Sequence, residues 1–145
     1  MKKDKNLKRS IILEHYQNPK NKGLIDDNDY IKINMNNQSC IDEINLMVKV
    51  KNGIIEDIKF DGEACAICIS STSIMIDTLI GKTIDEAKEI YNNFFKMIDE
   101  QKYNKEVLEQ AQVYDDIATQ PNRKKCALLP WWGIEKIMEE EKWKK

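Results

Sequence analysis

The first half of the chain contains segments in which apolar and polar residues alternate, which is the pattern of strands with one buried face. Residues 44–50, INLMVKV, alternate for much of their length, and residues 54–60, IIEDIKF, follow after the turn signal KNG at 51–53. These two segments predict a β-hairpin. A further strand is expected around residues 30–35, YIKINM.

Elsewhere the apolar residues recur with the period of a helix. The predicted helices cover, in chain order, residues 6–17, residues 65–81, the segment that begins at Thr83, short pieces within 103–120, and roughly residues 127–142. Thr83 and Glu86 form a capping-box signature at the start of the third helix. Gly81 is placed to end the helix before it, and residues 120–125, QPNRKK, are expected to form a loop.

Strands come first and helices follow, an order that is typical of α+β proteins. We therefore expect an α+β fold in which a small antiparallel sheet of about three strands carries helices on one face. The length of 145 residues suits a single domain that covers residues 1–145.

Composition and charge narrow the class of function. The formal net charge is −2, whereas nucleic-acid-binding proteins are usually basic, so no nucleic-acid partner is expected. No apolar run approaches the length of a membrane span, and the charged start is followed only by the short apolar segment 11–13, too short for a signal peptide. We expect a cytoplasmic protein with no membrane partner, whose four cysteines stay reduced and serve metal or sulfur chemistry.

Three of the cysteines lie where one predicted element meets the next. Cys40 stands in a loop that leads into a strand, and Asp42 follows it two residues later. Cys65 opens one helix and Cys126 precedes another, and both positions favour thiolate, the form that binds metals. The alternative for these two is a buried small apolar residue, and Asp42 taken alone is interpreted first as a turn or cap residue.

The other candidate ligands have weaker support. Cys68 follows Cys65 by three residues and is read first as a core residue or a neighbour of the site, with a fourth ligand or a resolving thiol as alternatives. The single histidine, His15, is interpreted as a surface or core residue. Three thiols and one carboxylate make a four-ligand set that suits zinc, or iron with sulfide.

Several stretches of the chain carry a family resemblance. They are ILEHYQNPKNKG at 12–23, NQSCIDEI at 37–44, FDGEACAICISSTSIM at 60–75, LIGKTIDEA at 79–87 and RKKCALLPW at 123–131. In this order they resemble the NifU/IscU-like family of iron–sulfur cluster assembly proteins, and within it the SufU branch. The long spacing from Cys65 to Cys126, and Lys125 where IscU-type proteins carry a histidine ligand, favour that branch.

The resemblance implies a SufE/NifU-like fold and a zinc site formed by Cys40, Asp42, Cys65 and Cys126. It implies a zinc-dependent sulfurtransferase whose partner is a SufS-like cysteine desulfurase. In the mechanism that the resemblance implies, the desulfurase holds sulfur as a persulfide, and one of its residues replaces a ligand of the zinc. Cys40 is thereby freed and becomes the catalytic acceptor of the sulfur. The sulfur then passes to downstream iron–sulfur assembly proteins or apo-proteins.

Two alternatives remain at this point. The same residues could hold iron in a [2Fe–2S] cluster, so that the protein is a scaffold and not an enzyme, or the zinc could be purely structural. The chain also departs from the family pattern beside the site. The departures are Ile41 and Ala64 in place of glycines, Cys68 in place of a serine, and the unusual Pro130 and Trp132.

Overall fold

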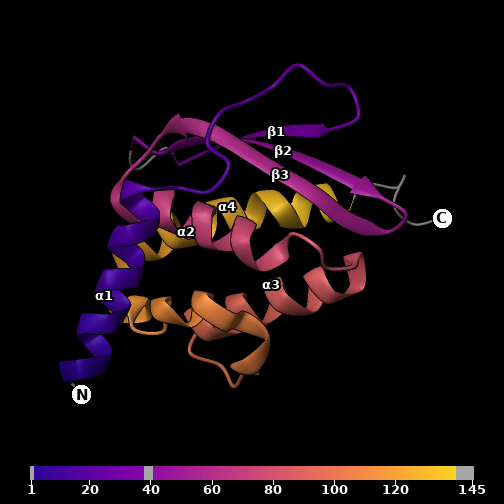
Figure 1. Ribbon diagram of the computed structural model, residues 1–145. Coiled ribbons are helices and arrows are strands. Elements are labelled where there is room, and N and C mark those ends of the chain that lie inside the picture. The colour runs from indigo at the N-terminus through magenta and orange to yellow at the C-terminus, as the bar shows by residue number, and fades with distance from the viewer. Residues whose placement is uncertain (1, 38–40, 140–145) are drawn as a thin grey trace.

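The computed structural model describes residues 2–37 and 41–139 (Figure 1). The elements, in chain order, are α1 (Lys2–Gln17), β1 (Ile31–Asn36), β2 (Glu43–Lys51), β3 (Ile54–Glu63), α2 (Ala66–Leu79), α3 (Ile84–Ile98), the 3-10 helices η1 (Glu106–Tyr114) and η2 (Ile117–Thr119), and α4 (Pro121–Met138). None of the helices in the described ranges combines the length and the apolar composition that a membrane span requires.

The three strands form one antiparallel sheet in the order β1-β2-β3. The β2–β3 hairpin turns at Asn52 and Gly53, whose φ angles of 55° and 76° are the pair of positive values that a tight hairpin turn needs. Ile44 and Leu46 of β2 are fully buried on the face that the helices cover, and Phe60 of β3 pairs with Leu46 in the register.

The helices lie on one face of the sheet, in two layers (Figure 1). α2 and α4 lie directly against the sheet and against each other, and α3 and η1 pack on their far side. α1 crosses one end of this stack and contacts α2 and η1. Because α2 contacts α1, α4, η1 and the sheet, 11 of its residues are buried, including several serines and threonines, whereas Asp77 is exposed.

The serine-rich sequence of α2 allows this helix to pack closely against α4. Ser71 Oγ donates a hydrogen bond to the carbonyl oxygen of Ala127 at 2.6 Å and accepts one from Trp131 Nε1 at 3.0 Å. The Trp131 ring stacks on Phe94 of α3, with ring centroids 4.2 Å apart. The small polar residue and the two aromatic residues therefore join three helices through fully satisfied contacts.

The sequence predictions for this fold are largely confirmed. The α+β class, the three antiparallel strands and the helices on one face are all present, and the Thr83–Glu86 capping box makes both of its hydrogen bonds. The 103–120 segment forms 3-10 helices, as the expectation of short helices requires.

The predicted start of the last helix is wrong. Residues 120–125, expected as a loop, lie almost entirely in α4, which begins at Pro121. A proline at the first position of a helix loses no internal hydrogen bond and has its φ angle already set, so it starts α4 earlier than the apolar pattern indicates. Pro130 then lies inside the helix, where it has no N–H to donate to the carbonyl of Cys126.

Gly62 of β3 lies too close to the paired strand to accept even the side chain of alanine. Its φ angle is +146°, and a Cβ atom there would lie 2.0 Å from the carbonyl oxygen of Glu43 on the paired strand. Overpacking costs about 1–3 kcal/mol and left-handed backbone adds about 1–2 kcal/mol. We expect Gly62→Ala to lower the free energy of unfolding by about 3 kcal/mol, measured by urea denaturation.

Gly53→Ala is the matched control. Gly53 also has a positive φ of +76°, but no atom lies within 4 Å of the Cβ position. The control should therefore lose only the backbone term, about 1 kcal/mol. Equal losses for the two variants would contradict the close approach of Gly62 to β2.

Candidate metal centre

The β2–β3 register brings two of the predicted ligands together at one end of the sheet. Glu43 pairs with Glu63 in the last step of the ladder. Asp42 comes immediately before this pair, and Cys65 comes two residues after it. Strands joined by a hairpin hold their free ends side by side, so the residues that flank the final pair become neighbours.

A third predicted ligand, Cys126, comes from α4, which packs along α2. One ligand atom from each of Asp42, Cys65 and Cys126 lies within 4.8 Å of the other two. Tetrahedral zinc ligands are separated by roughly 3.4–3.8 Å, given metal–ligand bonds of about 2.0–2.3 Å, so small side-chain movements would close the site on an ion. Two sulfurs and one carboxylate oxygen are also the donor types that zinc and iron accept.

Asp42 supports the start of α2 as well as facing the thiols. It is 1% exposed, and its Oδ1 accepts a hydrogen bond of 2.8 Å from the backbone N–H of Cys65, the N-cap residue of α2. Its Oδ2 lies 3.8 Å from the Cys65 sulfur. The cap-like role and the ligand role, which the sequence presented as alternatives, are therefore compatible, because each uses a different oxygen.

Cys126 occupies a different environment from the one expected. It lies in the second turn of α4, not ahead of the helix, and is buried, whereas the neighbouring Arg123 and Lys125 are exposed to solvent. Burial raises the pKa of the Cys126 thiol, and hydrogen bonds with Asp42 and Cys65 raise it further. The expected thiolate is therefore not favoured by the protein alone at this position, and a bound cation would be needed to stabilise it.

Cys40, the predicted catalytic thiol and fourth ligand, lies outside the described residues. The residues beside this gap are defined. Asn37 donates a backbone hydrogen bond of 3.0 Å to the carbonyl oxygen of Asp42, and Ile41 is 83% exposed. Ile41 therefore presents an exposed apolar side chain directly beside Asp42, a predicted ligand.

Cys68 and His15 are core residues, as the first interpretation of each allowed. Cys68 is fully buried within the hydrophobic core and is not part of the described ligand cluster. His15 is bonded through Nδ1 to Ser73 Oγ at 2.7 Å and through Nε2 to Gln110 Oε1 at 2.8 Å. These bonds connect α1 to α2 and η1, and give the histidine a structural role.

Comparison with known proteins places this site in a family. The family model for the NifU-like N-terminal domain matches residues 7–127. The chain is 38% identical to the zinc-dependent sulfurtransferase SufU of Bacillus subtilis, over 93% of this chain and 91% of that protein. It is 31% identical to the iron–sulfur cluster assembly scaffold protein IscU of Thermotoga maritima, over 89% of this chain and 90% of that protein.

A solved structure agrees with these sequence matches. The crystal structure of a putative iron–sulfur cluster assembly scaffold protein for the SUF system from Fervidobacterium islandicum superposes with a TM-score of 0.85 and 34% identity, over 89% of this chain and 94% of that one. With its sheet, its helical layers and its Asp42–Cys65–Cys126 cluster, the chain belongs to the NifU-like N-terminal domain family of iron–sulfur cluster assembly proteins, among which SufU is a relative.

Proposed function

We propose that the protein is a zinc-dependent sulfurtransferase that accepts sulfur from a SufS-like cysteine desulfurase on Cys40. It would pass that sulfur to downstream iron–sulfur assembly proteins or apo-proteins. The observation that carries the proposal is the preformed cluster of Asp42, Cys65 and Cys126 at the end of the sheet. Asp42 of this cluster follows Cys40 by two residues in the sequence. The 38% identity to a zinc-dependent sulfurtransferase supports it.

The proposed zinc ligands are Cys40, Asp42, Cys65 and Cys126. A zinc ion bound there would keep the thiols deprotonated while restraining their reactivity until one of them is released. The three described ligands are held by the fold: Asp42 by the N–H of Cys65, Cys65 as the N-cap of α2, and Cys126 by its burial in α4. Cys40 would then be the ligand that leaves and reacts.

The transfer step is a thiol–persulfide exchange. The Cys40 thiolate attacks the terminal sulfur of the desulfurase persulfide, and a new S–S bond forms on Cys40. The old S–S bond breaks, and the desulfurase cysteine leaves as a thiolate. No external oxidant or reductant is required. Because thiols must stay reduced for this chemistry, the proposal places the protein in the cytoplasm.

A second candidate function is a scaffold for a [2Fe–2S] cluster. The 31% identity to an IscU scaffold favours it, and two thiols with a carboxylate also suit iron. Lys125 stands before Cys126, where a histidine ligand would support the scaffold role, so we place this function second.

The function is tested by the turnover of the cognate cysteine desulfurase, with and without the zinc-loaded protein. We expect strong stimulation by the wild-type protein and a return to the basal rate with Cys40→Ala, because that variant removes the acceptor thiol. Cys68→Ser is the matched control and should stimulate nearly as well as the wild type, since Cys68 is buried in the core. No stimulation, with a coloured cluster forming from iron and sulfide, would establish the scaffold function instead.

The role of Asp42 as a ligand can be separated from its role as a cap. In Asp42→Asn, the amide oxygen can still accept the N–H of Cys65 but is a poor zinc ligand. We expect zinc affinity to fall by more than about 100-fold, beyond the usual effect of a residue that only orients ligands. Competition with a chromophoric chelator measures the affinity.

The metal-free melting temperature of Asp42→Asn should stay close to that of the wild type. Asp42→Ala should lower both the zinc affinity and the metal-free melting temperature, because it also removes the acceptor that caps α2. Unchanged zinc affinity in Asp42→Asn would exclude Asp42 from the ligand set.

Removal of the metal distinguishes a functional zinc site from a structural one. Cys126 belongs to the hydrophobic core and Cys65 packs against it, but most of the core residues are apolar side chains outside the three-residue cluster. We therefore expect chelation to lower the melting temperature, by the linkage between binding and folding, and to leave the helical circular dichroism signal intact at 25 °C. Loss of that signal on chelation would indicate a zinc-dependent fold.

A further inference from the structure

A pocket of about 680 Å³ opens between α1, η1, η2 and the first turn of α4. Its volume is in the range of small-molecule binding sites. Asp42, Cys65 and Cys126 do not line it, so it is distinct from the metal centre. Two of its lining residues are nevertheless close to that centre along the chain. Ile67 lies two residues after Cys65, and Arg123 lies three residues before Cys126.

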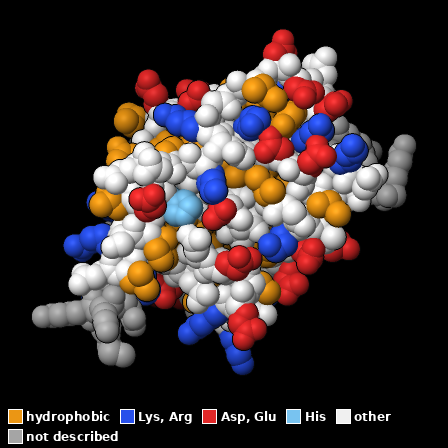
Figure 2. Space-filling model, in the orientation of Figure 1, with side chains coloured by type: hydrophobic (Ala, Val, Ile, Leu, Met, Phe, Trp, Pro, Cys, Tyr) orange, Lys and Arg blue, Asp and Glu red, His pale blue; other side chains and the backbone are white. Residues whose placement is uncertain are grey.

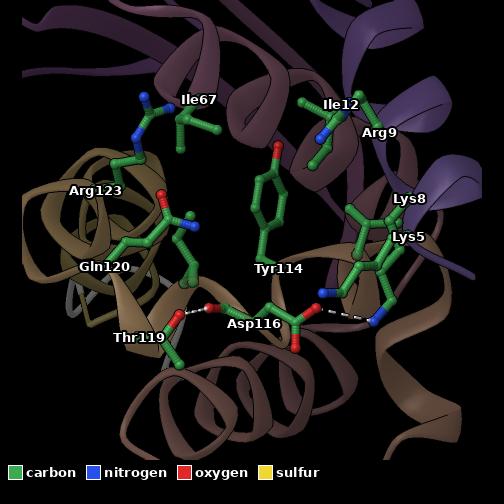
Figure 3. Close-up of a pocket in the computed structure, with 12 residues that line it drawn as sticks. Lys5, Lys8, Arg9, Ile12, Ile67, Tyr114, Asp116, Thr119, Gln120 and Arg123 are labelled. Atoms are coloured by element: carbon green, nitrogen blue, oxygen red, sulfur yellow. Dashed lines mark hydrogen bonds and ion pairs between the residues drawn. The ribbon is translucent and has the colours of Figure 1, made fainter. Parts of the chain in front are cut away.

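The base of the pocket is apolar. Ile12, Ile67 and Val113 contribute aliphatic side chains, and Tyr114 lies between the two sides of the pocket (Figure 3). The Tyr114 hydroxyl is bonded to Ser70 and the residue is 1% exposed, so its ring supports the base from beneath, while Ile12 and Ile67 are the partly exposed side chains there. A ligand would therefore find a hydrophobic surface between the polar groups of the rim.

Cationic side chains gather on two sides of this apolar base. Lys5, Lys8 and Arg9 of α1 stand on one side and Arg123 of α4 on the other (Figure 3). These four cations face one lining carboxylate, Asp116, although the whole chain has a net charge of −2. By contrast, acidic and basic side chains are interspersed on the face of the molecule shown in Figure 2.

Most of these cations are not neutralised by the protein. Lys8 pairs with Asp115 at 2.7 Å and with Asp116 at 3.5 Å. Lys5, Arg9 and Arg123 make no ion pair with the side chains that the structure describes. Guanidinium groups bind phosphate and carboxylate through two parallel hydrogen bonds, so two arginines on opposite sides provide two such positions.

We propose that this pocket is a binding site for a small organic anion that carries a negative group at each end, of the bisphosphate or dicarboxylate class. One end binds at Arg9 with Lys5 and the other at Arg123, and the middle of the ligand lies over the apolar side chains of Ile12 and Ile67. The proposal does not depend on the sulfurtransferase function. A bound ligand would contact the first turns of both helices that carry cysteines of the metal centre.

The test is an NMR titration of the zinc-loaded, full-length protein with fructose 1,6-bisphosphate, succinate and inorganic phosphate. We expect saturable amide shifts centred on Ile67, Val113 and Arg123 for one or both two-ended anions, and weaker binding of inorganic phosphate. Arg9→Ala and Arg123→Ala should each weaken binding by about tenfold, because each removes a charge-assisted contact. Lys32→Ala, which removes an exposed charge on β1, is the control and should leave affinity unchanged.

Four results would overturn the proposal. If Lys32→Ala loses as much affinity as the arginine variants, the attraction is nonspecific. If inorganic phosphate binds as tightly as the two-ended anions, one side of the pocket binds the anion without the other. Shifts centred on Asp42, Cys65 and Cys126 would indicate direct binding to the metal. Binding of a hexaglutamate peptide without binding of either two-ended anion would assign the pocket to an acidic protein segment.

Discussion

The hydrogen bond from the N–H of Cys65 to Oδ1 of Asp42 joins the open end of the β2–β3 hairpin to the start of α2. It forms because both residues lie just beyond the last pair of the ladder, Glu43 with Glu63. A slip of one residue in this ladder would separate the two groups and would also turn buried side chains such as Ile44 to the outer face. The core that fixes the register therefore also fixes the distance between Asp42 and Cys65 in the candidate metal centre.

The position of Cys126 depends on how closely α4 approaches α2. Ser71 of α2 donates to the carbonyl of Ala127, the residue after Cys126, and so holds that turn of α4 against the helix that begins at Cys65. A larger residue at position 71 would push the helices apart, since Ser71 is fully buried where α2 contacts α4. The serines of α2 thus serve the site through helix spacing.

Local patterns in the sequence were sufficient to predict the hairpin, the capping box at Thr83 and the start of α2, because each depends on neighbouring residues. They also pointed to Asp42, Cys65 and Cys126 as possible ligands, and the structure brings these residues together. The environment of Cys126 was not predictable in the same way, because it depends on where α4 begins and on burial by distant segments. Cys40 stays a prediction, since it lies outside the described residues.

The pocket between α1 and α4 was missed for a related reason. Its cations come from Lys5, Lys8 and Arg9 near one end of the sequence and from Arg123 near the other, and no local pattern connects them. They meet because α1 packs across the end of α2 and η1, where the buried bonds of His15 hold it. The single histidine of the chain thus contributes to the placement of α1.

The unequal burial of the ligand cluster has a consequence for sulfur transfer. Asp42 and Cys126 are 1% and 5% exposed, and Cys65 caps a helix, so moving any of them would break buried contacts. Pro130 leaves the carbonyl of Cys126 without its helical partner, yet burial still confines that thiol. The fold therefore opposes displacement of these three side chains, and the proposed mechanism assigns the exchange step to Cys40, the predicted ligand two residues before Asp42.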